Sequence, residues 1–253
     1  MLLVREYKRI KKSSYMIAAA LIVLLSAIFM SLLISNDIRL GISIFGELTT
    51  FKNGDSILLN GANYSKGIGL IVAIIINLFI GKEHQYKTWQ HLTSHNIRRN
   101  KIYFAKFVTS IFIAVGLFFV YELVSYGILT AFDFRVMSLM AFLKLILGGA
   151  IIYSMLARFI CFISMVTKNH ISSLIISIAF VLFEAPLVRL LGNISEITGF
   201  SQIYSYIVKY SLYGVNELVQ IQTNYFPTVF VGIFIWIVST VLIGQTVFNK
   251  IEL

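Results

Sequence analysis

Charged and helix-breaking residues are scarce in this chain of 253 residues. Asp, Glu, Lys and Arg together make up 13%, two residues are proline, 58% are apolar, and the mean hydropathy is +0.86. A soluble domain carries roughly 25% charged residues, and a chain of this length cannot bury such an apolar excess, so a membrane protein is expected. The single cysteine, Cys161, lies in an apolar run and cannot form an intramolecular disulfide, so it is interpreted as a small hydrophobe.

Sequence motifs for catalysis, metal binding and nucleic-acid binding are missing as well. The chain contains no G-x-x-x-x-G-K-[ST], so we do not expect it to hold ATP phosphates itself. His91 and His95 lie four positions apart, but only His84 is near enough to be a third ligand, so no metal site is predicted. The basic clusters are small and adjoin apolar runs, which argues against nucleic acid. We therefore expect no catalytic residues and no cofactor in this chain.

Long apolar runs dominate what is present. A transmembrane helix needs about 20 mostly apolar residues, and lipid admits only helices and closed barrels. The sequence therefore predicts an all-α integral membrane protein, a single transmembrane domain over 1–253. Its expected spans are 14–34, 62–80, 107–131, 148–167, 171–191 and 225–247.

Lysine and arginine set the expected orientation, because basic loops stay in the cytoplasm. The two dense basic clusters, at the start of the chain and between the second and third spans, fall on one side if both termini are cytoplasmic. Residues 2–13 have helical amphipathic spacing, with Leu3, Tyr7 and Ile10 on one face. The opposite face is basic and carries Arg5, Lys8, Arg9 and Lys12. We expect an interfacial helix in contact with anionic lipid, or else a segment whose charge only fixes orientation.

A more polar segment, 192–224, precedes the last expected span. Tyrosine is enriched at membrane interfaces, where its ring is apolar and its hydroxyl remains hydrated. We expect one or two re-entrant helices in the outer leaflet, with an outer gate formed by four closely spaced tyrosines, Tyr204, Tyr206, Tyr210 and Tyr213.

Three charged residues fall inside predicted spans. Glu122, Arg158 and Glu184 each cost about 2.5–3.5 kcal/mol at a helix centre, so burial without a role is not expected. Arg158 and Glu184 lie at similar depth, which favours an ion pair between the fourth and fifth spans. The alternative is that these charges line a transport path or gate.

The basic loop after the second span carries a pattern. Glu83 is followed by Thr88, Leu92 and Arg99, and then by Lys106 at the start of the third span. This pattern and the six-span layout resemble the permease subunits of type 2 ABC exporters, similar to short bacterial permeases for antimicrobial or cytolytic peptides and self-immunity. Lys87 and Asn96 stand where that family usually has glycine and proline.

The resemblance implies a cytoplasmic coupling helix that inserts into a separate ABC ATPase subunit, present in two copies. Its apolar anchors are expected to be Trp89, Leu92 and Ile97. Its other expected residues are Glu83, Lys87, Thr88, Arg98 and Arg99. The alternative is an ordinary basic loop that satisfies topology. ATP and magnesium would be bound by the partner.

The same resemblance implies a dimer of permease subunits, identical or homologous, in the bacterial plasma membrane. The cargo would be hydrophobic or amphipathic, with a peptide toxin or antimicrobial peptide expected first. A lipid or a hydrophobic drug would fit the same residues. Two other classes stay open, an ion-driven secondary transporter and an integral membrane enzyme or sensor, although neither inverted repeats nor a polar catalytic cluster is visible.

Overall fold

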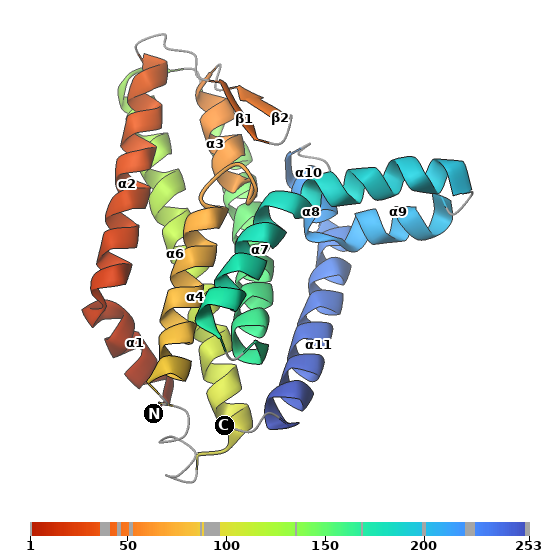
Figure 1. The fold of residues 1–253 in the computed structure, drawn as a ribbon. Helices are drawn as coiled ribbons and strands as arrows, with labels where there is room; N and C mark the ends of the chain where they lie inside the picture. Colours follow the sequence, from red (N-terminus) through yellow and green to blue (C-terminus); the bar gives the residue numbers. More distant parts are fainter. Residues whose placement is uncertain are drawn as a thin grey trace.

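The structure, a computed structural model, describes residues 2–35, 41–44, 47–50, 53–86, 88, 97–134, 136–167, 169–198, 201–220 and 226–250. Helices account for most of the described residues, and a two-stranded hairpin accompanies them (Figure 1). In chain order the elements are α1 (Leu2–Lys12), α2 (Ser14–Ser35), β1 (Gly41–Ile44), β2 (Glu47–Thr50), α3 (Gly54–Ala62), α4 (Gly69–Gln85), α6 (Arg99–Ala131), α7 (Leu139–Val166), α8 (His170–Thr198), α9 (Ser201–Tyr210), α10 (Leu212–Gln220) and α11 (Phe226–Lys250).

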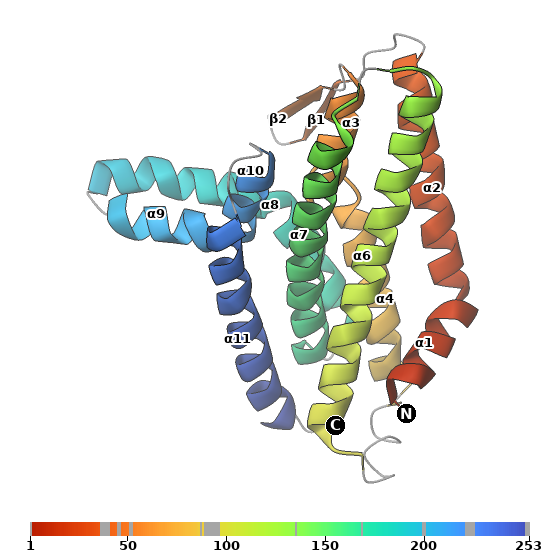
Figure 2. The ribbon, with the colours of Figure 1, turned by 180° about the vertical axis from the view of Figure 1, so that it is seen from behind.

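Four of the described helices are long and apolar enough to cross a membrane. They are α2 over Ser14–Leu33, α6, α7, and α8 over His170–Ser195. Figures 1 and 2 show α2, α4, α6, α7 and α11 side by side along one direction. Helices α2, α6, α7 and α8 overlap four of the six expected spans, although α6 and α7 begin earlier than the expected residues 107 and 148. The other two spans stay predictions.

The second expected span, 62–80, differs from the helix found there. Asn63 bends the chain, because its side-chain oxygen accepts from the N–H of Ser65 at 3.1 Å and its carbonyl accepts from that of Gly67 at 2.7 Å. Such local bonds compete with helix formation. Helix α4 therefore starts only at Gly69 and has 17 residues, about 25 Å at 1.5 Å per residue.

The loop between the first two expected spans holds structure that its sequence did not indicate. Strands β1 and β2 pair antiparallel, with Gly41 opposite Thr50. Helix α3 begins with a capping box, in which Asn53 and Ser56 exchange side-chain and backbone hydrogen bonds. The carboxylate of Asp55 accepts the N–H of Met137 at 2.6 Å and so ties this region to the entry of α7.

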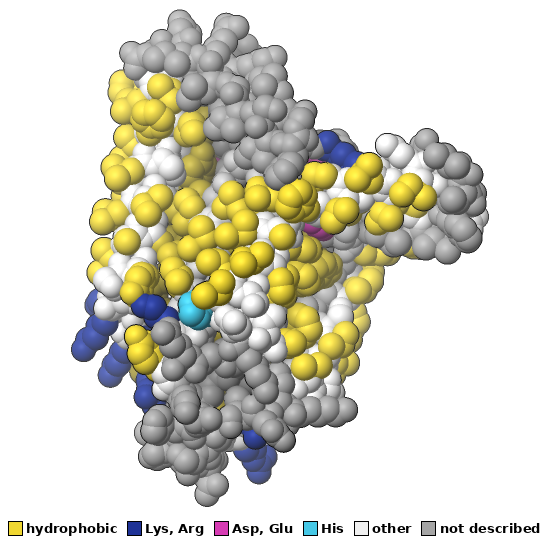
Figure 3. Space-filling view, viewed as in Figure 1, with side chains coloured by type: hydrophobic (Ala, Val, Ile, Leu, Met, Phe, Trp, Pro, Cys, Tyr) yellow, Lys and Arg dark blue, Asp and Glu magenta, His cyan; other side chains and the backbone are white. Residues whose placement is uncertain are grey.

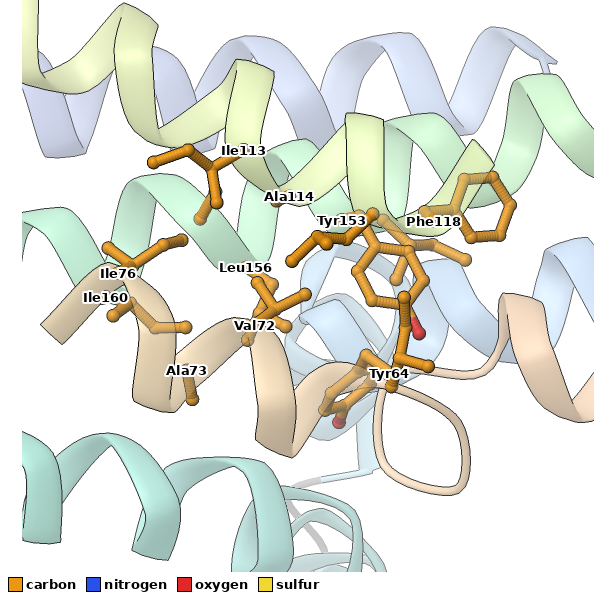
Figure 4. Close-up of a cluster of buried hydrophobic side chains, with 14 of the residues drawn as sticks. Tyr64, Val72, Ala73, Ile76, Ile113, Ala114, Phe118, Tyr153, Leu156 and Ile160 are labelled. Carbon is orange, nitrogen blue, oxygen red and sulfur yellow. The ribbon is translucent and has the colours of Figure 1, made fainter. Parts of the chain in front are cut away.

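The core lies where α4, α6 and α7 meet. Figure 4 shows Val72 and Ile76 of α4, Ile113 of α6, and Leu156 and Ile160 of α7 gathered in this interior, and all are buried. The outward surface of α2 is apolar instead, as Figure 3 shows in yellow, which suits contact with lipid.

A buried cluster of hydrogen-bonded polar side chains joins α4, α7 and α8. The amide oxygen of Asn77 accepts from the hydroxyl of Ser164 at 2.5 Å and from that of Ser173. The Asn77 amide nitrogen donates to the Ala73 carbonyl at 2.8 Å. Polar side chains of this kind hold helices together where apolar packing gives no advantage over lipid.

Helix α8 changes direction along its length. Its last part and α9 project together from the side of the bundle in both views (Figures 1 and 2). Pro186 lies inside α8, and a proline removes one backbone hydrogen bond and commonly kinks a helix. The segment expected to hold re-entrant helices does contain two short helices, α9 and α10, and their position in the outer leaflet stays a prediction.

Candidate coupling site

The expected coupling segment lies between the end of α4 and the start of α6. Lys87, Trp89 and Leu92 fall outside the described residues. Of the rest, Ile97 packs against the core. Arg98 is exposed at the N-cap of α6 and accepts the N–H of Lys101 at its carbonyl, 2.9 Å away. Thr88 and Arg99 are half-buried, and Glu83 is buried near the end of α4.

Four charged side chains from three helices meet where this segment leaves and re-enters the bundle. Glu6 and Arg9 come from α1, Glu83 from α4 and Lys106 from α6. The Lys106 ammonium lies 2.6 Å from the Glu6 carboxylate and also contacts the Glu83 carboxylate. The Arg9 guanidinium forms a second ion pair with Glu83. We call these four residues the basal clamp. Figure 1 shows α1, the end of α4 and the start of α6 together, at the end where both chain termini lie.

Most of the basal clamp is shielded from water. Lys106 is 1% exposed, Glu83 2% and Glu6 5%. Phe79 covers the cations, with its ring centroid 4.3 Å from the Arg9 guanidinium and 5.3 Å from the Lys106 ammonium. The Phe79 carbonyl also accepts from Arg9 at 2.9 Å. Two anions and two cations balance, which is the condition under which charges can be buried.

The charge state of Arg9 withstands this environment. Burial lowers the pKa of the Arg9 guanidinium, while the Glu6 carboxylate raises it and the neighbouring Arg5 lowers it further. Because arginine ordinarily has a pKa above 12, Arg9 stays charged at physiological pH.

Mechanical links run from the clamp helices to the rest of the bundle. The Tyr103 hydroxyl of α6 donates to the Thr240 carbonyl of α11 at 2.6 Å. Gly81 of α4 packs so closely on His170 of α8 that a Cβ at position 81 would overlap the His170 side chain. Close contacts thus connect the helices at the ends of the expected coupling segment to α8 and α11.

Sequence reasoning found half of this clamp. Glu83 and Lys106 were identified through the family pattern, but Arg9 was placed on the outward basic face of α1, and Glu6 was missed. The available signal was that Glu6 is the only acidic residue among the first 13 positions, three residues before Arg9. An acid inside a basic helix faces away from anionic lipid, toward a partner in the protein.

The expected ion pair between Arg158 and Glu184 is wrong. Glu184 instead accepts from the Tyr64 hydroxyl and from the Tyr213 N–H at 3.1 Å, in the first turn of α10. Arg158 stacks 5.2 Å from the ring centroid of Phe107, and its Nε and Nη1 find no hydrogen-bond partner among the described residues. Depth alone could not predict which helix faces pair, and the N-terminus of α10 offers donors that match a carboxylate.

Glu122 is fully buried at the contact between α6 and α3. Both of its carboxylate oxygens lack a hydrogen-bond partner among the described residues, and a Cβ at Gly61 would overlap the carboxylate. The structure therefore does not join Glu122 to Arg158 or Glu184.

The four tyrosines of the expected outer gate have different surroundings. Tyr213 accepts at its hydroxyl from the Arg189 Nε at 3.1 Å. The Tyr210 carbonyl accepts from the Trp236 indole at 2.9 Å, which ties α9 to α11. Tyr204 packs against Gly192 of α8, and Tyr206 is 64% exposed. Of the four tyrosines, only Tyr206 is largely exposed.

Four of the described helices are long and apolar enough to cross a membrane, which is typical of a multi-pass membrane protein. Residues 2–184 match the sequence profile of the ABC-2 family transporter proteins. This match covers more than half of the chain, so the chain belongs to that family and is the transmembrane subunit of an ABC transporter. Proteins of the family work with an ABC ATPase partner. No curated protein sequence matches the chain significantly.

Proposed function

We propose that this chain is the permease of an ATP-driven exporter in which two copies work with two separate ATPase subunits. The observation that supports this is the basal clamp, which holds α1, α4 and α6 together at the two ends of the expected coupling segment. A segment that transmits motion needs a rigid attachment to the helices, because a flexible attachment would absorb the displacement. In this proposal the clamp end of the molecule, with both termini, is cytoplasmic.

The proposed cargo is hydrophobic or amphipathic, with a peptide expected first. An apolar groove of about 470 Å³ lies between α7 and α8, lined by Phe159, Phe180 and Phe183 among others, with Glu184 at its edge. A surface of this kind suits a molecule taken up from the membrane rather than from water. The same groove would accept a lipid or a hydrophobic drug, so competition among the three classes in a transport assay decides the cargo.

Orientation and partner contact can be tested with a matched pair of cysteine variants. Arg98→Cys and Ala131→Cys replace exposed residues at opposite ends of α6, and the native Cys161 is buried. In intact cells a membrane-impermeant maleimide should label position 131 and spare position 98. In membranes that contain the assembled transporter, a bifunctional cross-linker should join position 98, and not position 131, to a protein that carries a Walker A motif.

Two results would count against the proposal. Labelling of position 98 from outside would invert the topology. Transport in purified vesicles that follows an ion gradient and ignores ATP would assign the chain to the secondary transporters instead.

A further inference from the structure

An apolar groove of about 700 Å³ lies between α1, α2 and α6, on a different part of the bundle from the proposed cargo groove. Helix α1 contributes Leu3, Val4, Tyr7 and Ile10, α2 contributes Met16 and Ala20, and α6 lines the rest. Lipid tails are as apolar as these side chains, so the groove by itself selects no particular lipid. Any selection must come from charge at its rim.

Helix α1 presents three faces, each with its own surroundings. One face lines the groove, and a second carries Glu6 and Arg9 into the basal clamp. The third is exposed and cationic. Its Lys8 and Lys11 each follow a groove-lining residue by four positions, Val4 and Tyr7, and residues four apart are neighbours on a helix surface. The two lysines therefore lie beside groove-lining residues on the surface of α1, and Figure 3 shows dark-blue side chains gathered at this end of the molecule.

We propose that this groove holds an acyl chain of an anionic phospholipid of the surrounding leaflet, with its phosphate placed between Lys8 and Lys11. An apolar groove with two lysines beside its lining residues matches a molecule that joins long alkyl chains to a net negative headgroup. A zwitterionic lipid would fill the groove equally well, but it would gain less from the lysines. The bound lipid would brace α1 from the side opposite the clamp. This inference needs only a membrane-embedded chain and is independent of the proposed export function.

Two glycines of α6 supply a matched pair of variants. Gly116 lines the groove, and a Cβ built there meets no described atom within 4 Å. A leucine at this position therefore does not clash with its neighbours, and its side chain fills the groove. Gly127 is equally open and does not line the groove. It lies eleven positions further along, on nearly the same face at 100° per residue. Gly127→Leu therefore adds the same bulk to the same helix outside the groove.

The experiment is native mass spectrometry of the full chain, taken from nanodiscs of equal parts phosphatidylglycerol and phosphatidylcholine. The wild type should retain phosphatidylglycerol preferentially. Lys8→Gln and Lys11→Gln should each reduce that preference by about fivefold, without loss of total lipid. Gly116→Leu should lose both lipids, and Gly127→Leu should behave as the wild type.

Three results would overturn the proposal. They are equal retention of the two lipids by the wild type, wild-type retention by Gly116→Leu, and an effect of Gly127→Leu as large as that of Gly116→Leu. If Gly116→Leu instead converts a dimer to a monomer while lipid retention is unchanged, the groove is an interface between copies of the chain. Thermal unfolding of both leucine variants shows whether each is folded.

Discussion

Glu83 and Lys106 are 23 positions apart, yet their side chains form a buried ion pair where the expected coupling segment leaves and re-enters the bundle. Glu83 lies two residues before the end of α4, and Lys106 is two turns into α6. The pair closes the segment into a loop with fixed ends. Arg9 and Glu6 extend the pair to α1, so this helix shares the same attachment.

The first prediction concerns the balance of charge in the clamp. Lys106→Met leaves Glu6 and Glu83 with Arg9 as their remaining clamp cation, and breaking a buried pair costs about 3–5 kcal/mol. The double variant Glu83→Leu/Lys106→Met removes one charge of each sign and should recover most of that loss. Thermal unfolding in detergent measures both effects.

Lys101→Met is the control for this prediction, because Lys101 is an exposed lysine of the same helix. It should leave the unfolding temperature unchanged, and an equal loss in both lysine variants would mean that the clamp is not the cause. If the double variant is stable but its transport no longer responds to ATP, the clamp serves coupling and not only folding.

The second prediction concerns Arg158, whose partner is an aromatic ring rather than a carboxylate. Because its Nε and Nη1 lack hydrogen-bond partners among the described residues, Arg158→Met should fold at least as stably as the wild type. A charge kept in a membrane helix at a cost of about 2.5–3.5 kcal/mol is expected to have a function, so transport should fall. Unfolding temperature and transport rate are measured on the same preparation, and a destabilised variant would indicate a structural role.

The third prediction concerns Glu184, which joins α8 to Tyr64 and to the first turn of α10. Glu184→Leu leaves the Tyr64 hydroxyl and the Tyr213 N–H without their acceptor, and each unsatisfied buried donor costs about 1–3 kcal/mol. Glu184→Gln keeps one carbonyl oxygen and should lose less. The ranking wild type, Gln, Leu in unfolding temperature checks this arrangement, and a Leu variant as stable as the wild type would contradict it.

The sequence predicted well what periodicity and apolar length determine. The first, third, fourth and fifth expected spans overlap α2, α6, α7 and α8, because a chain in lipid has few alternatives to the helix. It did not predict the side-chain contacts that depend on which faces of the helices pack together. The partners of Arg158, Glu184 and Arg9 are set by the rotation of each helix about its axis, and a list of depths does not contain that rotation.

Local chemistry explains the remaining differences. The Asn63 turn shortens the second expected span because its hydrogen bonds are formed within a few residues. In the sequence such competition is visible only as two asparagines, Asn60 and Asn63, near glycines. The bend of α8 is marked by Pro186, one of two prolines in the chain. Both signals consist of few residues within apolar runs, and a span prediction based on mean hydropathy is insensitive to them.

The fourth prediction tests the close contact between α4 and α8 at Gly81. Gly81→Ala places a Cβ against the side chain of His170 beside the α8 backbone, so the two helices must separate. Overpacking of this kind costs about 1–3 kcal/mol. Gly127→Ala is the control, because its Cβ meets no described atom within 4 Å, and alanine there should stabilise α6 slightly through its higher helix propensity. Opposite shifts in unfolding temperature are therefore expected for the same chemical change, together with reduced transport only for Gly81→Ala. Equal shifts would show that α4 and α8 are not in tight contact at Gly81.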